Sequence, residues 1–138
     1  MELTRWAGTR LRERRGQAMV EFALVMPILL LLVFGVTEFS RAFMTLNVIT
    51  SAAREGCRLA VVTGPDATAV TARVNEVCAA ARVVPTNVAV VGPDPLDVER
   101  RVTVTVQTNF QVLSARVLGT FRGTIPLTAS TVMRHESF

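Results

Sequence analysis

The sequence is poor in the residues that most often perform chemistry. Its 138 residues include no tyrosine, one histidine, one tryptophan and two cysteines. Lysine is also absent, so all 15 basic residues are arginines, a bias that we attribute to genomic base composition. Five arginines lie in residues 1–15, and from Gly16 onward ten arginines face nine acidic residues. No basic stripe interleaved with aromatic residues remains, so we expect no nucleic-acid partner.

The scarcity of histidine and cysteine also argues against an enzyme or a metal protein. The histidine, His135, stands beside Glu136 near the end of the sequence, where a solvated side chain is the simplest interpretation. Two cysteines without supporting histidines make a poor zinc site. The scattered serines lack a base, and no glycine-rich phosphate loop occurs. We expect no enzymatic activity, no cofactor or metal, and no small-molecule substrate.

One long hydrophobic run dominates the chain. Gln17 to Val36 comprises 20 residues with a single charge, Glu21, which is enough for a helix to cross about 30 Å of hydrocarbon. The run is longer than the apolar region of a cleaved secretory signal, and no matching cleavage site follows it. Arginines beside a span stay in the cytoplasm. The sequence therefore predicts a single-pass membrane protein, with its N-terminus in the cytoplasm and its C-terminal part exported.

The helical pattern continues beyond the span. From Glu38 to Val62 apolar residues recur at three- and four-residue steps, which predicts a helix with one packing face. The Gly64-Pro65 pair is expected to end it. The predicted face consists of Phe39, Phe43, Leu46, Ile49, Ala53, Cys57 and Ala60.

The rest of the chain predicts one short helix and a small sheet. Asp66 can cap a second helix with an apolar face, and residues 92–95 read as a turn. Period-two alternation predicts strands at Asn87–Val91, Arg101–Val112 and Ile125–Arg134, with a possible helical turn near Gly119 between the last two. The helix face comprises Val70, Val74, Val77, Cys78 and Ala81. The predicted fold class is α+β, in which helix covers one face of an antiparallel sheet of about three strands.

These predictions divide the chain into three parts. Residues 1–16 form a cytoplasmic leader, residues 17–62 a transmembrane and extended helix, and residues 63–138 an exported α+β domain. Within the extended helix, Gly56 and its neighbouring alanines form a small-residue patch. The patch permits close packing either on a partner helix or on the chain's own sheet. Cys57 and Cys78 either form a disulfide closing a loop of about 20 residues or stay as two buried thiols.

The start of the hydrophobic run resembles a processing site. A basic leader, Gly16, four residues, Glu21, Phe22 and an apolar helix resemble the prepilin peptidase site of type IV pilin-like proteins. The wider stretch RRGQAMVEFALVMPILLLLVFGVTEFSRAF, followed by AAREGCRLA at 52–60, resembles the TadE-like family of pilus-assembly pseudopilins, as does the closing LTASTVMRHE at 127–136. The resemblance implies cleavage after Gly16, which would expose Gln17 as the new N-terminus.

The resemblance also implies a function and partners. The chain would be a TadE-like minor pilin or pseudopilin in the assembly of Flp (type IVc, tight-adherence) pili, and its partners would be prepilin peptidase and other pilin subunits. Glu21 and Phe22 would serve assembly. A sibling role of the TadF type is a further alternative within the same system. The alternative from another class is an uncleaved, signal-anchored module that binds in the envelope.

Overall fold

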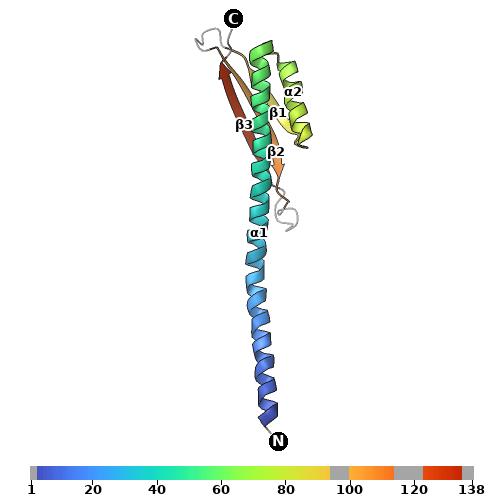
Figure 1. Ribbon diagram of the computed structural model, residues 1–138, viewed down its shortest axis with the longest axis vertical. Helices are drawn as coiled ribbons and strands as arrows, with labels where there is room; N and C mark the ends of the chain where they lie inside the picture. The colour runs from blue at the N-terminus through green and yellow to red at the C-terminus, as the bar shows by residue number, and fades with distance from the viewer. Residues whose placement is uncertain (1–2, 94–99, 114–122, 135–138) are drawn as a thin grey trace. The chain divides into compact units, whose positions relative to one another are not determined.

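A computed structural model describes the backbone of residues 3–93, 100–113 and 123–134, and the side chains of these ranges from Gly16 onward (Figure 1). Its elements are helices α1 (Leu3–Thr63) and α2 (Ala67–Ala80) and strands β1 (Pro85–Val91), β2 (Arg101–Gln111) and β3 (Thr124–Arg134). The predicted α+β fold is confirmed. The expectations for Gly119 and His135, and for part of the turn at 92–95, lie outside the described residues. The chain divides into two compact units, Met1–Thr37 and Glu38–Phe138.

In the first unit, α1 has no buried side chain between Gly16 and Thr37. A window of this helix reaches a mean hydropathy of 2.6, and none of that window is buried. Among the described residues it is the one helix that is long and apolar enough to cross a membrane. An apolar surface without a partner in its own chain is expected for a membrane anchor.

The second unit is a three-stranded antiparallel sheet covered on one face by helix. The strand order is β1-β2-β3, so β2 is central and the other two strands are edges. Alternate residues of β2 are buried, from Val102 to Phe110, while the residues between them are exposed or half-buried. This is the alternation that the sequence predicts. Pro126, opposite Asn109, lies on the edge strand β3, where a missing N–H can be tolerated.

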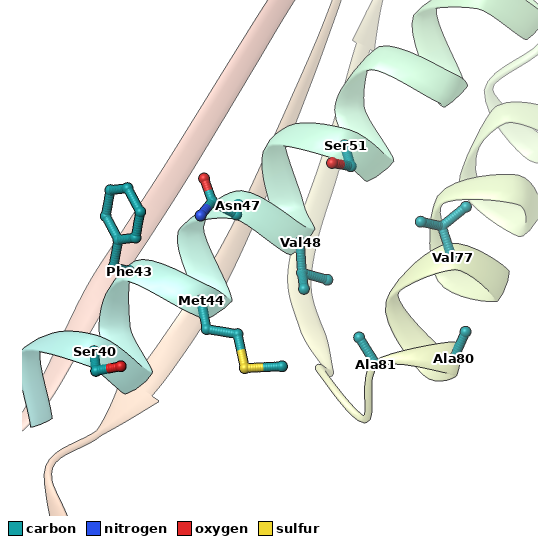
Figure 2. A pocket seen from close by; sticks show the side chains of 9 residues that line it. All are labelled: Ser40, Phe43, Met44, Asn47, Val48, Ser51, Val77, Ala80 and Ala81. Carbon is teal, nitrogen blue, oxygen red and sulfur yellow. The ribbon is translucent and has the colours of Figure 1, made fainter. Parts of the chain in front are cut away.

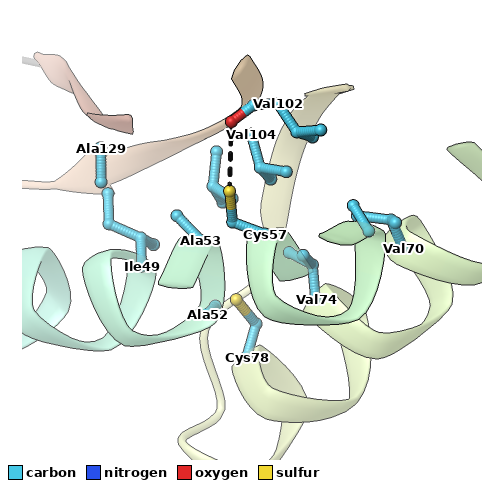
Figure 3. Close-up of a cluster of buried hydrophobic side chains, with 12 residues drawn as sticks. Ile49, Ala52, Ala53, Cys57, Val70, Val74, Cys78, Val102, Val104 and Ala129 are labelled. Atoms are coloured by element: carbon cyan, nitrogen blue, oxygen red, sulfur yellow. Dashed lines mark hydrogen bonds between the residues drawn. The ribbon is translucent and has the colours of Figure 1, made fainter. Parts of the chain in front are cut away.

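The hydrophobic core lies between this sheet and both helices (Figure 3). The α1 residues that line it are mostly small, so the helix can approach the sheet closely. The central strand contributes three fully buried valines. The core residues are Ile49, Ala52, Ala53, Cys57 and Ala60 of α1, Val70, Val74 and Cys78 of α2, and Val102, Val104, Val106 and Ala129 of the sheet.

The predicted packing face of α1 is wrong at its first two positions. Phe39 is 74% exposed and Phe43 is 55% exposed, and from Gly16 onward Ile49 is the first buried residue of the helix. At this level the sheet lies beside a different side of the helix, because the guanidinium of Arg41 lies 5.3 Å from the ring centroid of Phe110 near the end of β2. Residues two positions from Arg41, such as Phe39 and Phe43, point to nearly the opposite side. Ile125, which pairs with Phe110 at the start of β3, is still 50% exposed.

The ends of the helices follow local sequence signals. Gly64 has a φ of +93° directly after α1, a conformation that glycine adopts without steric cost. The side chain of Asp66 accepts a hydrogen bond of 2.9 Å from the N–H of Thr68 and caps α2, as predicted. After α2, Arg82 takes a φ of 57° and donates its N–H to Ala79, while Val83 donates to Cys78. This pair of bonds is a Schellman ending, here with arginine where glycine is commoner.

Candidate processing and assembly site

The residues of the predicted processing site lie together on one face of α1. Gly16, Gln17 and Glu21 line a shallow depression of about 370 Å³ with Val20 and Leu24. Helical spacing explains this grouping, because residues three, four and seven or eight apart share a face. Phe22 does not line the depression and is 63% exposed.

The carboxylate of Glu21 is exposed. It makes no hydrogen bond or ion pair with any side chain that the structure describes. All the other residues that line the depression are uncharged. A carboxylate in a membrane helix costs about 2.5 kcal/mol at the bilayer centre and less near the interface. Glu21 therefore needs a cationic partner from outside the described part of the chain, or a position among lipid headgroups.

Packing does not require a glycine at position 16. An added Cβ at Gly16 would meet nothing within 4 Å, and glycine in a helix is less favourable than alanine by about 1 kcal/mol. The same open space surrounds Gly35 within the apolar run. Gly16 differs from Gly35 in its place at the boundary between the basic leader and the apolar helix.

Gly56 has a structural role within the chain's own core. A Cβ added there would lie 2.7 Å from Cγ2 of Val74, 3.3 Å from Cγ1 of Val70 and 3.5 Å from Cγ1 of Val104. The glycine thus lets α1 contact both α2 and the central strand. Of the two alternatives for the small-residue patch, the structure supports packing on the chain's own elements.

Cys57 and Cys78 are both buried free thiols (Figure 3). The thiol of Cys57 donates a hydrogen bond of 3.3 Å to the carbonyl oxygen of Val102 on β2. Burial raises the pKa of both thiols, so little reactive thiolate forms. Their positions on the apolar faces of the two helices are as predicted.

A groove runs between residues 40–51 of α1 and the C-terminal end of α2 (Figure 2). Its volume is about 560 Å³, and Met44 and Val48 of α1 point toward Ala81 at the end of α2. The groove was missed by sequence reasoning, because residue spacing does not show where a second helix stops covering the first. The other lining residues are Ser40, Phe43, Asn47, Ser51, Val77 and Ala80.

An ion-pair cluster links α1 to α2 at Glu55. Its carboxylate accepts hydrogen bonds of 3.0 Å from Nη2 of Arg58 and from Nη2 of Arg73, and Arg73 also pairs with Glu76 at 2.8 Å. The hydrogen bonds from Arg58 and then Arg73 lower the pKa of Glu55 to about 2. The pairs within each helix follow from three-residue spacing, but the contact between helices could not be found that way.

Metal ligands do not gather in the part of the chain that the structure describes, where no three histidine, cysteine or acidic side chains are close enough to hold an ion. The site that stands out is therefore the exposed face of the apolar helix at Gly16, Gln17 and Glu21. Chemically, it presents one peptide bond at a glycine and one carboxylate without a described partner.

Together, the exposed apolar helix and the small α+β domain suggest a membrane-anchored protein, with one candidate span among the described residues. Residues 16–58 match the family model described as TadE-like protein. The resemblance inferred from the sequence is thus confirmed over this segment, which is less than half of the chain. Comparisons with curated proteins and with solved structures found no match. A TadE-like match suggests involvement in a tight-adherence pilus system.

Proposed function

We propose that this protein is a minor pilin or pseudopilin that takes part in the assembly of Flp (type IVc) pili and is cut by prepilin peptidase between Gly16 and Gln17. The observation that carries the proposal is a coincidence of position. The TadE-like match begins at residue 16. Gly16 is also the first of the three residues, with Gln17 and Glu21, that lie on one exposed face of α1. Phe22, beside this face, begins the purely apolar part of the helix.

Cleavage would give Glu21 a partner. The cut creates a positive α-amine on Gln17, four residues or about 6 Å of helical rise from Glu21. The carboxylate can pair with this amine or with the amine of a neighbouring subunit. Negative charge near a helix N-terminus is also stabilised by the helix dipole. Glu21 would then set the register in which apolar helices assemble.

The proposal includes a location and a set of partners. The basic leader stays in the cytoplasm, the apolar helix crosses the cytoplasmic membrane once, and the domain is exported. The partners are prepilin peptidase, which meets the leader at the membrane surface, and other pilin subunits. The protein acts by assembly and has no enzymatic activity of its own.

Mass spectrometry of the mature protein from its native host tests the cut. The mature chain should begin at Gln17. Replacing Gly16 by isoleucine should block cleavage, because a branched side chain then occupies the position next to the cut. The matched control is Gly35→Ile, at a glycine with equally open surroundings, which should leave cleavage intact. A mature chain that still begins at Met1 would support the uncleaved envelope-binding anchor instead.

A second variant separates assembly from processing. Glu21→Ala should be cleaved normally but should incorporate poorly into pili, because the new amine loses its carboxylate partner. Leu24→Ala removes an apolar side chain from the same face and serves as the control. Pili would be counted by electron microscopy of surface-sheared material. Normal pilus assembly with Glu21→Ala would eliminate the proposed role of the carboxylate.

A further inference from the structure

Three large apolar side chains are exposed on α1 directly beyond the hydrophobic run. Phe39 is 74% exposed, Phe43 55% and Met44 65%. The rings of Phe39 and Phe43 stack with their centroids 6.3 Å apart. The core of the domain does not cover them, since from Gly16 onward the first buried residue of the helix is Ile49. Exposed apolar clusters of this kind mark contact surfaces.

Other exposed apolar residues lie at the same end of the domain. Arg41 contacts the ring of Phe110 near the end of β2, so this strand ends level with the exposed part of α1. Ile125 pairs with Phe110 and is 50% exposed, and Leu113, just after β2, is 53% exposed. We call the three α1 residues Phe39, Phe43 and Met44 the membrane-proximal patch.

The position of Glu21 determines where the bilayer ends along α1. A hydrocarbon layer of about 30 Å takes 20 helical residues. If it begins at Gln17 it ends at Val36, and Glu21 then lies inside the hydrocarbon. If Glu21 stays among the headgroups, the layer begins at Phe22 and ends at Arg41. Of these two registers of the helix in the bilayer, the second, Phe22–Arg41, is favoured because the Glu21 carboxylate costs less at the interface than in hydrocarbon.

The second register is compatible with the charges at its outer end. Glu38 and Arg41 form an ion pair of 3.1 Å, and the long arginine side chain can reach the headgroups. Charged side chains in membrane spans commonly pair with one another, and Glu38 is paired with Arg41. Phe39 then lies inside the outer boundary of the hydrocarbon, with Phe43 and Met44 just beyond it in the interface.

We propose that the membrane-proximal patch rests on the lipid bilayer, which spans from Phe22 to Arg41. The patch belongs to the same helix as the span, and its three members are exposed apolar side chains. Because the patch and the span belong to one continuous helix, insertion of the span into the bilayer also brings the lipid surface to the patch. The inference concerns the uncleaved chain, in which Glu21 has no new α-amine to pair with. It needs neither cleavage nor pilus assembly, so it can fail or hold independently of the proposed function.

Tryptophan fluorescence in vesicles can measure the register. Trp6 is the only native tryptophan, so full-length chains carrying Trp6→Phe would each receive one new tryptophan. The matched pair is Leu24→Trp and Phe39→Trp, at side chains that are 71% and 74% exposed. These positions are equidistant from the midpoint of Phe22–Arg41. In the Gln17–Val36 register, Leu24 would lie near the bilayer centre and Phe39 outside the hydrocarbon.

The vesicles would contain phosphatidylcholine and phosphatidylglycerol, with bromine placed at shallow or deep acyl positions as quencher. We expect Leu24→Trp and Phe39→Trp to show the same quenching depth, and Phe43→Trp to be quenched by shallow bromine. Val62→Trp, at a 77% exposed valine near the end of α1, is the control and should be quenched several-fold less.

Two results would overturn the inference. Deep quenching of Leu24→Trp together with water-like, unquenched emission of Phe39→Trp and Phe43→Trp would establish the Gln17–Val36 register. Blue-shifted but unquenched emission at Phe39 and Phe43 would show that protein, such as a second copy of the chain, covers the patch instead of lipid.

Discussion

At the scale of single residues, Gly56 has the clearest role in the fold. Its missing side chain lets α1 lie against two valines of α2 and one of β2, and an added Cβ would come within 2.7 Å of Val74. Valine is stiff about its only side-chain torsion, so its methyl groups cannot move aside without shifting the backbone of α2. The close approach of the helices therefore depends on this residue.

Replacing Gly56 by alanine should destabilise the domain. Overpacking of a core costs about 1–3 kcal/mol, while alanine gains about 1 kcal/mol of helix propensity over glycine. We expect a net loss of about 1 kcal/mol in the free energy of unfolding. Urea unfolding of the full chain in mild detergent, followed by circular dichroism, measures it. Gly35→Ala, where an added Cβ meets nothing within 4 Å, is the control. Equal or greater stability of Gly56→Ala would contradict the close packing.

At the scale of elements, the contact between α1 and α2 combines an apolar interface with the ion pairs of Glu55. Glu55 has a pKa of about 2 against an ordinary 4.5, because it accepts hydrogen bonds from Arg58 and Arg73. A carboxyl whose pKa is lower in the folded state stabilises the fold above its unfolded pKa. That stabilisation is lost as the pH falls through the folded value.

The stability difference between the wild-type chain and Glu55→Gln should therefore depend on pH. We expect the wild type to have the higher Tm at neutral pH, and the difference to shrink as the pH falls from about 5 toward 2. Thermal unfolding of both chains across this range is the measurement. Glu76→Gln serves as control, because Glu76 is 70% exposed and pairs with Arg73 alone. A Tm difference that does not change with pH would contradict the assigned cause.

The elements also show what residue spacing can and cannot predict. The buried alternation of β2 and the capped apolar face of α2 were predictable because each depends on local geometry alone. The exposure of Phe39 and Phe43 was not predictable, since spacing alone does not show that Phe110 contacts the helix through Arg41, on nearly the opposite side. The environment of Gly56 was ambiguous for a similar reason, because spacing identifies a close-packing face without identifying its partner. The contact of Glu55 with Arg73 depends on how two helices pack.

For the candidate site, what the sequence could predict is limited for a different reason. Gly16, Gln17 and Glu21 were found from their spacing and resemblance, and the structure places them on one exposed face. Their proposed chemistry depends on a peptidase and on neighbouring subunits, which the sequence of one chain does not contain. The groove beside Met44 could be found only once α2 was in place.

At the scale of the whole molecule, we expect the arginine distribution to set the orientation in the membrane. Five arginines precede the apolar run, within residues 1–15, while Arg41 and Arg54 are the ones that follow it within 20 residues. Positive charges near a span are retained in the cytoplasm. The leader should therefore stay inside while the domain is exported.

A reporter fusion can test this orientation. Alkaline phosphatase, which is active only after export, should be active when fused after the C-terminal end of the chain. Replacing Arg10, Arg12, Arg14 and Arg15 by glutamine should lower its activity, because the charge asymmetry is then lost. Replacing Arg100 and Arg101 by glutamine should leave it unchanged, since both are remote from the span. High activity of the four-arginine variant would show that other features set the orientation.

The small residues of α1 have a last consequence for how this domain tolerates mutation. In most cores the damaging changes are truncations, because large side chains leave cavities. Ala52, Ala53 and Ala60 are fully buried in the core and have only one methyl group to lose, whereas a larger residue must displace other core side chains. A saturation survey of these positions should be strongly one-sided, with enlargement depleted and reduction tolerated. Sequence drift in this helix is then limited by an upper bound on side-chain volume.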